Sequence, residues 1–145
     1  MALTGTYLRS LDEKQRIAVP KRLRDAMSPK ELKELYVGPE VDHALALFSP
    51  ESFERRAQRL EEATSARSRV TNYLRLYYSQ AERVEVDSQG RIRLPERLVE
   101  FAKLQQEVVL LGVHDHVEIW DKTTWQDFFR RHSQEFDQLA AEVFN

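Results

Sequence analysis

The sequence contains the same fourteen-residue motif twice, and this duplication constrains the fold more than any other feature. The first copy runs from Leu11 to Arg24, and the second runs from Val86 to Val99, seventy-five positions later. Six aligned positions are identical: Asp12/Asp87, Arg16/Arg91, Ile17/Ile92, Pro20/Pro95, Arg22/Arg97 and Leu23/Leu98. A period of this length is too long for a solenoid repeat. We therefore interpret the chain as two fused copies of one small unit.

Each copy is predicted to form a strand, a turn, a second strand and a short helix. Residues 3–9 are rich in Thr, Tyr and Leu, and residues 16–19 alternate in polarity after the polar break at residues 12–15. Pro20 then stands where proline is favoured, at the first position of a helix. The second copy repeats the pattern, and the remaining strands are expected at residues 35–38, 44–48, 107–112 and 117–120.

Neither half is expected to be stable alone. A unit of about 45 residues buries little apolar surface, and its short strands would leave open edges. We therefore expect the halves to interdigitate into one closed, barrel-like sheet with pseudo-twofold symmetry and with helices outside. The expected boundaries are residues 5–50 for the first half, 51–80 for a helical connector, 81–124 for the second half and 125–145 for a C-terminal helix.

Composition and charge distribution narrow the function. The chain has no cysteine, which excludes disulfides and cysteine-based zinc sites and suits a reducing cytosol. No secretory signal is visible, and no apolar run approaches the roughly 20 residues that span a bilayer, so no membrane partner is expected. The net charge is −2, yet residues 9–24 hold six basic and two acidic side chains, a local charge of +4. The first motif is therefore a candidate anion-binding surface.

The paired motifs resemble those of the MraZ family, in which each motif runs through Ile and a short strand into Pro. Leu110–Gly112, and Glu118–Asp121 followed by Trp125, also resemble the second half of that family, so the resemblance covers nearly the whole chain. MraZ proteins are bacterial transcriptional regulators with two SpoVT-AbrB-type halves. The resemblance implies an α+β double-split β-barrel and assembly into a homo-oligomeric ring in the cytoplasm, associated with the nucleoid. It also implies binding to repeated double-stranded DNA sequences upstream of the family's own division and cell-wall gene cluster.

One position departs from the family pattern. The family places Gly before the motif Arg in both copies, whereas this chain has Gln15 in the first copy and keeps Gly90 in the second. If the turn requires a positive φ there, Gln costs about 1 kcal/mol or more. Either the first turn differs, or another residue supplies the conformational freedom.

The basic residues of both motifs are the candidate DNA-binding residues. They are Lys14, Arg16, Lys21, Arg22, Arg24, Arg91, Arg93 and Arg97. Asp12 and Asp87 would repel phosphate, so we expect them, with Gly90, to shape the turns. Arg16 and Arg91 could pair with these carboxylates, or they could reach a phosphate or a guanine edge.

Three of these residues, Lys21, Arg22 and Arg24, are expected in the first helical turn, where positive charge opposes the helix dipole. A phosphate bound there would turn that cost into attraction, and a solvated basic face is the alternative.

Other signals are weaker. His114 and His116 have a metal-pair spacing but no evident third ligand, and no motif of nucleophilic or phosphate-loop catalysis occurs. We expect no enzyme activity, cofactor, metal or small-molecule substrate. The apolar stripe of residues 125–143 is either core packing or a partner surface. Two other functions remain open: an AbrB-type antitoxin, and a ring-forming scaffold that does not bind DNA.

Overall fold

The computed structural model describes residues 2–62 and 67–145. The first half contains β1 (Thr6–Ser10), β2 (Arg16–Ala18), α1 (Lys21–Met27), β3 (Glu34–Pro39), the 3₁₀ helix η1 (Val41–His43) and β4 (Leu45–Phe48). Two helices follow, α2 (Pro50–Glu62) and α3 (Arg67–Gln80). The second half contains β5 (Glu82–Glu85), β6 (Arg91–Arg93), α4 (Glu96–Phe101), β7 (Glu107–Val113) and β8 (His116–Asp121). The chain ends with α5 (Lys122–His132), the 3₁₀ helix η2 (Ser133–Glu135) and α6 (Phe136–Phe144).

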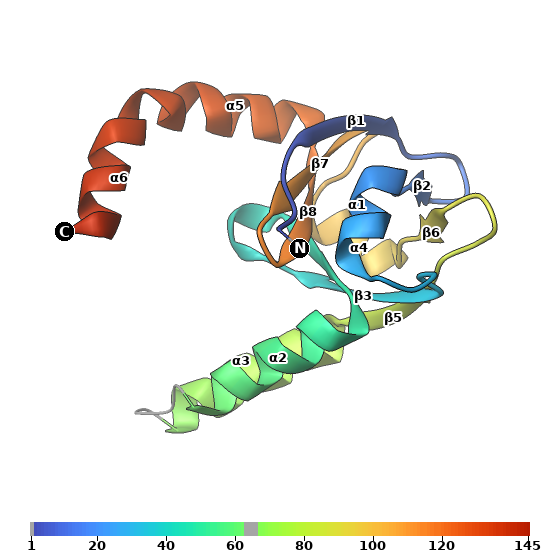
Figure 1. The fold of residues 1–145 in the computed structure, drawn as a ribbon, viewed down its shortest axis with the longest axis horizontal. Helices are drawn as coiled ribbons and strands as arrows, with labels where there is room; N and C mark the ends of the chain where they lie inside the picture. Colours follow the sequence, from blue (N-terminus) through green and yellow to red (C-terminus); the bar gives the residue numbers. More distant parts are fainter. Residues whose placement is uncertain (1, 63–66) are drawn as a thin grey trace.

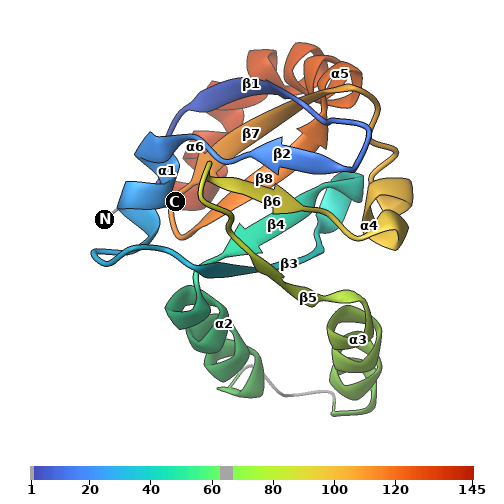
Figure 2. The same cartoon turned by 90° about the vertical axis from the view of Figure 1, so that its right-hand side faces the viewer.

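The strands of the two halves interdigitate. One antiparallel sheet has the order β1-β7-β8-β4-β3-β5, and β2 pairs with β6 in a separate two-stranded ribbon (Figure 2). Strand β1 of the first half pairs with β7 of the second, and β5 pairs with β3 in the same way. The registers are symmetric too, since Ile17 faces its equivalent Ile92 and Ala46 faces its equivalent Glu118. The predicted interdigitation and pseudo-twofold arrangement are confirmed.

The prediction of one closed sheet is wrong. Among the described residues, β1 and β5 form the two edges of an open six-stranded sheet, and the ribbon lies across one face of it (Figures 1 and 2). Pro20 and Pro95 follow closely after β2 and β6, which have three residues each. Proline lacks the N–H that a longer strand would need for pairing. The ribbon is therefore too short to join the sheet edges into a barrel, and the fold is α+β.

The main core lies between the sheet and the layer made by the ribbon with α1 and α4. Equivalent residues of both halves meet there, namely Ile17 and Ile92 on the ribbon and Leu23 and Leu98 on the two helices, each at most 2% exposed. Burial of a side chain of this size contributes about 1.5–3 kcal/mol. This shared core requires both halves, because neither could enclose it alone.

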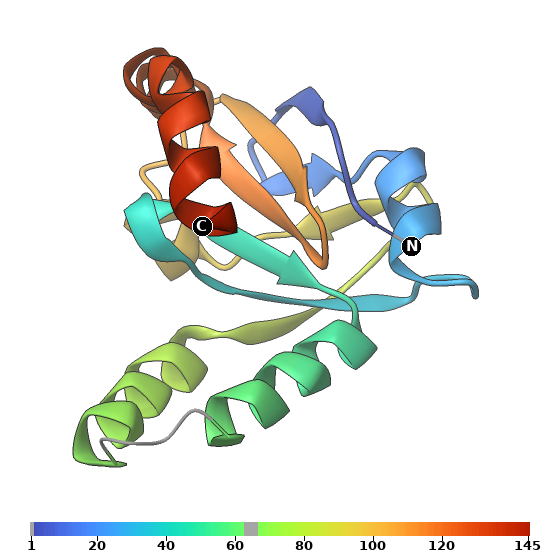
Figure 3. The ribbon, with the colours of Figure 1, turned by 60° about the vertical axis from the view of Figure 1, so that its left-hand side comes forward.

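The helices outside the core form two projections. Helices α2 and α3 extend from the sheet together (Figures 1 and 3), and Phe53 of α2 contacts Tyr77 and Tyr78 of α3 at their base. At the chain end, the single expected helix is instead two, α5 and α6, which differ in direction and are separated by η2 (Figure 1). Trp125 and Phe128 pack α5 against Trp120 of the sheet, whereas no residue of α6 is buried.

No helix in the described parts of the chain combines the length and the apolar character that crossing a membrane requires.

Candidate nucleic-acid interface

The loop between β1 and β2 is built around one carboxylate. Asp12 Oδ1 accepts hydrogen bonds from the backbone N–H groups of Lys14 (2.9 Å) and Arg16 (2.8 Å). Its second oxygen accepts a bond from Arg16 Nε at 2.8 Å. The backbone N–H donated by Arg16, with its side chain in support, outweighs partial burial and lowers the pKa of Asp12. The loop is therefore closed by an ionised Asp, and Arg16 is held by one of its three side-chain nitrogens.

The loop between β5 and β6 repeats this geometry. Asp87 Oδ1 accepts from the N–H groups of Gln89 and Arg91, both at 2.9 Å, and Oδ2 accepts from Arg91 Nε at 3.0 Å. The pKa of Asp87 is lowered for the same reasons, led by the Arg91 backbone N–H. The predicted structural role of both Asp residues agrees with these contacts. The side chains of Arg16 and Arg91 keep 32% and 30% of their surface exposed.

The departure at Gln15 does not change the turn. Gln15 itself adopts φ 61°, beside φ 76° for Gly90, and both residues donate to the carbonyl oxygen of the motif Asp at 2.9 and 3.0 Å. Neither expected alternative holds, because the turn is the same and no other residue supplies the freedom. Besides its positive φ, close packing also favours glycine at position 90, because a Cβ there would lie 2.6 Å from Arg24 Cζ.

The ribbon presents arginine on its outer face. Because side chains alternate across a strand, buried Ile17 and Ile92 point to the core, whereas Arg16, Arg91 and Arg93 lie on the opposite face. Arg16 and Arg93 are directly opposite each other in the ladder. Like charges in such a pair are destabilising. The pairs with Asp12 and Asp87 reduce this repulsion, and a bound anion would reduce it further.

The other predicted residues are divided between free and paired side chains. Arg22 and Lys14 are exposed, and their side chains make no hydrogen bond or ion pair with any other residue in ranges 2–62 and 67–145. Lys21 pairs with Asp25 at 2.8 Å, and Arg97 pairs with Glu82 at 3.0 Å.

Arg24 lies in the last turn of α1, not in the first turn as expected, because this helix has only seven residues. It donates from Nε to the carbonyl oxygen of Val19 at 3.0 Å and covers the Gly90 turn.

A shallow groove of about 580 Å³ adjoins the ribbon and adds one residue that the sequence analysis missed. Arg83 on β5 lines it together with Arg16, Arg91 and Arg93, and it pairs with Glu34 at 2.7 Å. Four carboxylates line the same groove, namely Glu82, Glu85, Asp87 and Glu96. The groove is thus electrically mixed, because the arginines of the outer face of the ribbon and these carboxylates line it together. No sequence motif marks Arg83. Its place beside the ribbon follows from the fold, in which β5 pairs with β3 at the edge of the sheet.

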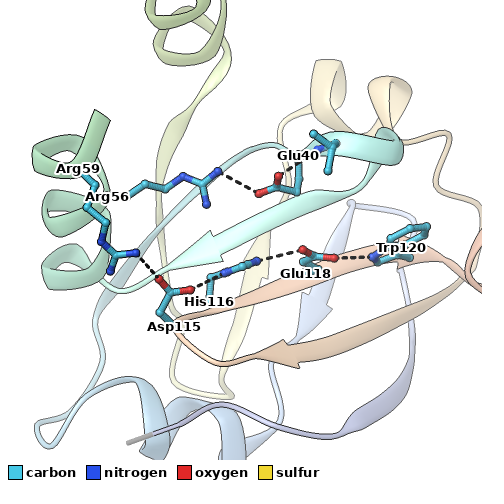
Figure 4. A network of polar contacts seen from close by, with 8 residues as sticks. Glu40, Arg56, Arg59, Asp115, His116, Glu118 and Trp120 are labelled. Atoms are coloured by element: carbon cyan, nitrogen blue, oxygen red, sulfur yellow. Dashed lines mark hydrogen bonds and ion pairs between the residues drawn. The ribbon is translucent and has the colours of Figure 1, made fainter. Parts of the chain in front are cut away.

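A second polar cluster lies between α2 and the β7–β8 hairpin. Figure 4 shows His116 between two carboxylates, with Nδ1 2.8 Å from Asp115 Oδ1 and Nε2 3.0 Å from Glu118 Oε2. Arg59 of α2 reaches Asp115 at 3.5 Å, and Trp120 Nε1 donates to Glu118 at 2.9 Å. Since only the protonated imidazole donates from both nitrogens, this arrangement favours the imidazolium.

The electrostatics of His116 follow from this geometry. Burial alone would lower the pKa of His116, but the hydrogen bonds to Glu118 and Asp115 outweigh it and raise the pKa. Glu40, His116 and Glu118 place metal-ligand-type atoms within 4.8 Å of one another. His116 is thus grouped with two glutamates, and His114, its partner in the sequence pattern, is not part of this group. Arg56 holds Glu40 at 3.3 Å. The carboxylates therefore already have cations of the protein beside them.

The comparisons with known proteins agree with the repeated loops. The family described as "MraZ protein, putative antitoxin-like" matches residues 2–75 and 77–145. A relative named transcriptional regulator MraZ from Moorella thermoacetica is 31% identical over 96% of this chain and 94% of its own. Proteins of the same name from Desulforamulus reducens and Mycobacterium avium are 32% and 33% identical, each over 96% of this chain and 95% and 94% of their own. With both motif loops present and nearly the whole length matched, the chain belongs to the MraZ family of transcriptional regulators.

Proposed function

We propose that this protein is a sequence-specific DNA-binding regulator that contacts double-stranded DNA with the outer face of the β2–β6 ribbon and its two loops. The observation that carries the proposal is the placement of Arg16 opposite Arg93, with Arg91 on the same face. Asp12 and Asp87 offset part of the charge of Arg16 and Arg91, and the positive charge that Arg93 adds to the same face favours a polyanion. A two-stranded ribbon also has the dimensions to enter the major groove.

The Asp residues give each motif Arg a defined role. Asp12 and Asp87 hold Nε of Arg16 and Arg91, which fixes the plane of each guanidinium. The terminal amino groups can then approach a phosphate or the O6 and N7 atoms of guanine in a bidentate manner. Lys14 and Arg22, whose side chains have no partner within residues 2–62 and 67–145, would add phosphate contacts beside the ribbon.

Assembly would make this modest surface effective. One subunit offers only a few phosphate contacts, so its binding would be weak and sensitive to salt. Several subunits in a ring would engage several DNA repeats at once and raise the apparent affinity through effective concentration. We propose repeats upstream of the protein's own division and cell-wall gene cluster, repression of that cluster, and a location in the cytoplasm at the nucleoid. The two SpoVT-AbrB-type halves, with the boundaries expected above, would form a variant of the double-split barrel.

A mobility-shift experiment with DNA from upstream of the gene tests the proposal. The variant Arg16→Ala/Arg93→Ala is expected to lose at least tenfold in affinity, since it removes the opposed pair. Arg130→Ala is the matched control, because Arg130 lies on α5 and pairs with Asp127. Equal binding by both variants would contradict the proposed surface.

The word "antitoxin-like" in the family description favours one alternative. An antitoxin would use the same loops on DNA and would also hold a partner protein. Co-expression of the neighbouring genes with this protein, followed by a growth assay, distinguishes the two functions. Relief of a growth defect by this protein would support the antitoxin, and assembly without any DNA binding would indicate the scaffold.

A further inference from the structure

The two ends of the β2–β6 ribbon are related by the pseudo-twofold symmetry of the fold. Strands β2 and β6 are antiparallel with Ile17 opposite its equivalent Ile92, so the symmetry axis passes between these two residues. The strands run in opposite directions (Figure 2), which places the β1–β2 loop at the first end of the ribbon and the β5–β6 loop at the second end. Two identical copies would present the same side chains at both ends. Any difference between the ends is therefore a place where they can recognise different bases.

The outer face of the ribbon differs between the ends at one position. It has two rows of side chains, Arg16 with Arg93 at the first end and Ala18 with Arg91 at the second end. Ala18 is the equivalent of Arg93, so the second end has a methyl group where the first end has a guanidinium group. The rows are two residues apart along each strand, which corresponds to roughly 7 Å, or about two base pairs of DNA. The two rows would therefore face different base pairs.

The two loops differ at the equivalent positions Lys14 and Gln89. The backbone holds both residues in the same way, because each donates its N–H to Oδ1 of the motif Asp at 2.9 Å. Both side chains are exposed, and neither makes a hydrogen bond or an ion pair within residues 2–62 and 67–145. The second loop therefore offers a neutral amide at the position where the first loop offers an ammonium group.

These side chains match different base edges in the major groove. Arginine and lysine donate to O6 and N7 of guanine, whereas the amide of glutamine accepts from N6 and donates to N7 of adenine. An alanine methyl group makes an apolar contact with the methyl group of thymine. Neither Ala18 nor Gln89 adds a charge that would attract phosphate. The chemistry of the second end therefore suits A·T pairs, and that of the first end suits guanine.

We propose that Gln89 and Ala18 determine base specificity at the second end of the ribbon. Gln89 contacts the edge of an adenine through its amide, and Ala18 contacts the methyl group of a thymine. The first end reads guanine with Arg16, Arg93 and Lys14. This inference rests on the proposed binding of DNA by the ribbon, and it identifies the residues that select the sequence at each end.

Competition binding by the full chain to a set of DNA duplexes tests this assignment, with each base pair of one upstream repeat replaced in turn. Gln89→Lys gives the second loop the side chain of the first loop, and Ala18→Arg makes the two rows alike. Each variant is expected to exchange an A·T preference at one position for guanine, with a change in relative affinity of about fivefold or more. Such an exchange cannot result from misfolding, which would weaken binding to every duplex. Gln126→Lys, the same change at an exposed position of α5, should keep the wild-type preferences.

The salt dependence of binding separates a base contact from a phosphate contact. Gln89→Ala is expected to lose the adenine preference and to keep the wild-type salt slope, because a neutral side chain releases no counterion. Wild-type preferences at every position in Gln89→Lys or in Ala18→Arg would overturn the role of that residue. If Arg16→Ala/Arg93→Ala still loses affinity in the same experiment, the specificity assignment alone has failed. If that variant also binds like the wild type, the DNA surface itself is wrong, and the specificity assignment is wrong with it.

Discussion

Gln15 holds a backbone conformation that suits glycine, and this makes the two motif loops unequal in energy. Its φ of 61° lies in the left-handed region, where a side chain costs about 1–2 kcal/mol. The hydrogen bonds of the loop are nevertheless the same as those around Gly90. The first loop is therefore held in place against a local strain that the second loop lacks.

Replacement of Gln15 with Gly is expected to stabilise the protein by about 1 kcal/mol, because the strain is removed while part of the gain is lost to the freer unfolded chain. Thermal unfolding should show a rise in Tm of roughly 3–4 °C. Gly90→Ala is the reciprocal control and should destabilise, since it adds both strain and a clash with Arg24. An unchanged or lower Tm for Gln15→Gly would contradict the strain.

A substitution at Asp12 can test whether its carboxylate orients Arg16, separately from its role in closing the loop. In Asp12→Asn, the amide oxygen can still accept from the backbone N–H groups of Lys14 and Arg16, but the amide nitrogen cannot accept from Arg16 Nε. We expect the loop to persist and the affinity for DNA to fall severalfold, because Arg16 loses its orientation. Fluorescence anisotropy with labelled DNA measures the affinity, and Glu13→Gln is a charge-matched control in the same loop. Affinities that match between these two variants would show that Asp12 does not orient Arg16.

Among the elements, α2 and the β7–β8 hairpin meet at the cluster of charges around the buried His116. The pKa of His116 is raised above its unfolded value, so its stabilising effect is complete below about pH 6.5 and is lost as pH rises through the folded pKa. The pKa of Glu118 is lowered because its bonds from His116 and Trp120 outweigh burial, so its effect is lost only as pH falls through that lowered value. The connection should be strongest between these limits, in mildly acidic solution.

His116→Gln tests this pH dependence. The difference in Tm between the wild type and the variant should be larger at pH 5.5 than at pH 8.5, because the wild type loses the imidazolium as pH rises. His132→Gln is a suitable control, since His132 is more exposed and lies on α5. A difference that stays constant or grows toward pH 8.5 would exclude a charged His116.

Element positions followed from the sequence more reliably than their arrangement did. Alternation and proline position located both strands of the ribbon and the helices that follow them, because these signals are local. The break between α5 and α6 was missed, since the apolar stripe continues through η2. The His116 cluster was also missed as a cluster, because Glu40 and Arg56 come from elements distant in sequence. A two-histidine spacing contains no information about such partners.

At the scale of the whole molecule, the duplication predicted that the strands of the two halves pair symmetrically, but not whether the edges of the sheet close into a barrel. Symmetric pairing of equivalent strands follows from two copies that share one core. Closure into a barrel depends on strand length and stagger, which periodicity does not encode. The outer face of the ribbon could be predicted in part, since the motif arginines were identified, whereas the opposition of Arg16 and Arg93 required the register.

The salt dependence of DNA binding tests most directly whether two equivalent loops face DNA. The logarithm of the binding constant for upstream DNA should fall linearly with the logarithm of salt concentration, with a slope of about −0.9 per phosphate contact. Arg16→Ala and Arg91→Ala should each weaken binding and reduce the magnitude of the slope by about 0.9, and the double variant should combine both losses. An affinity and a slope that stay at the wild-type values in all three variants would contradict the account.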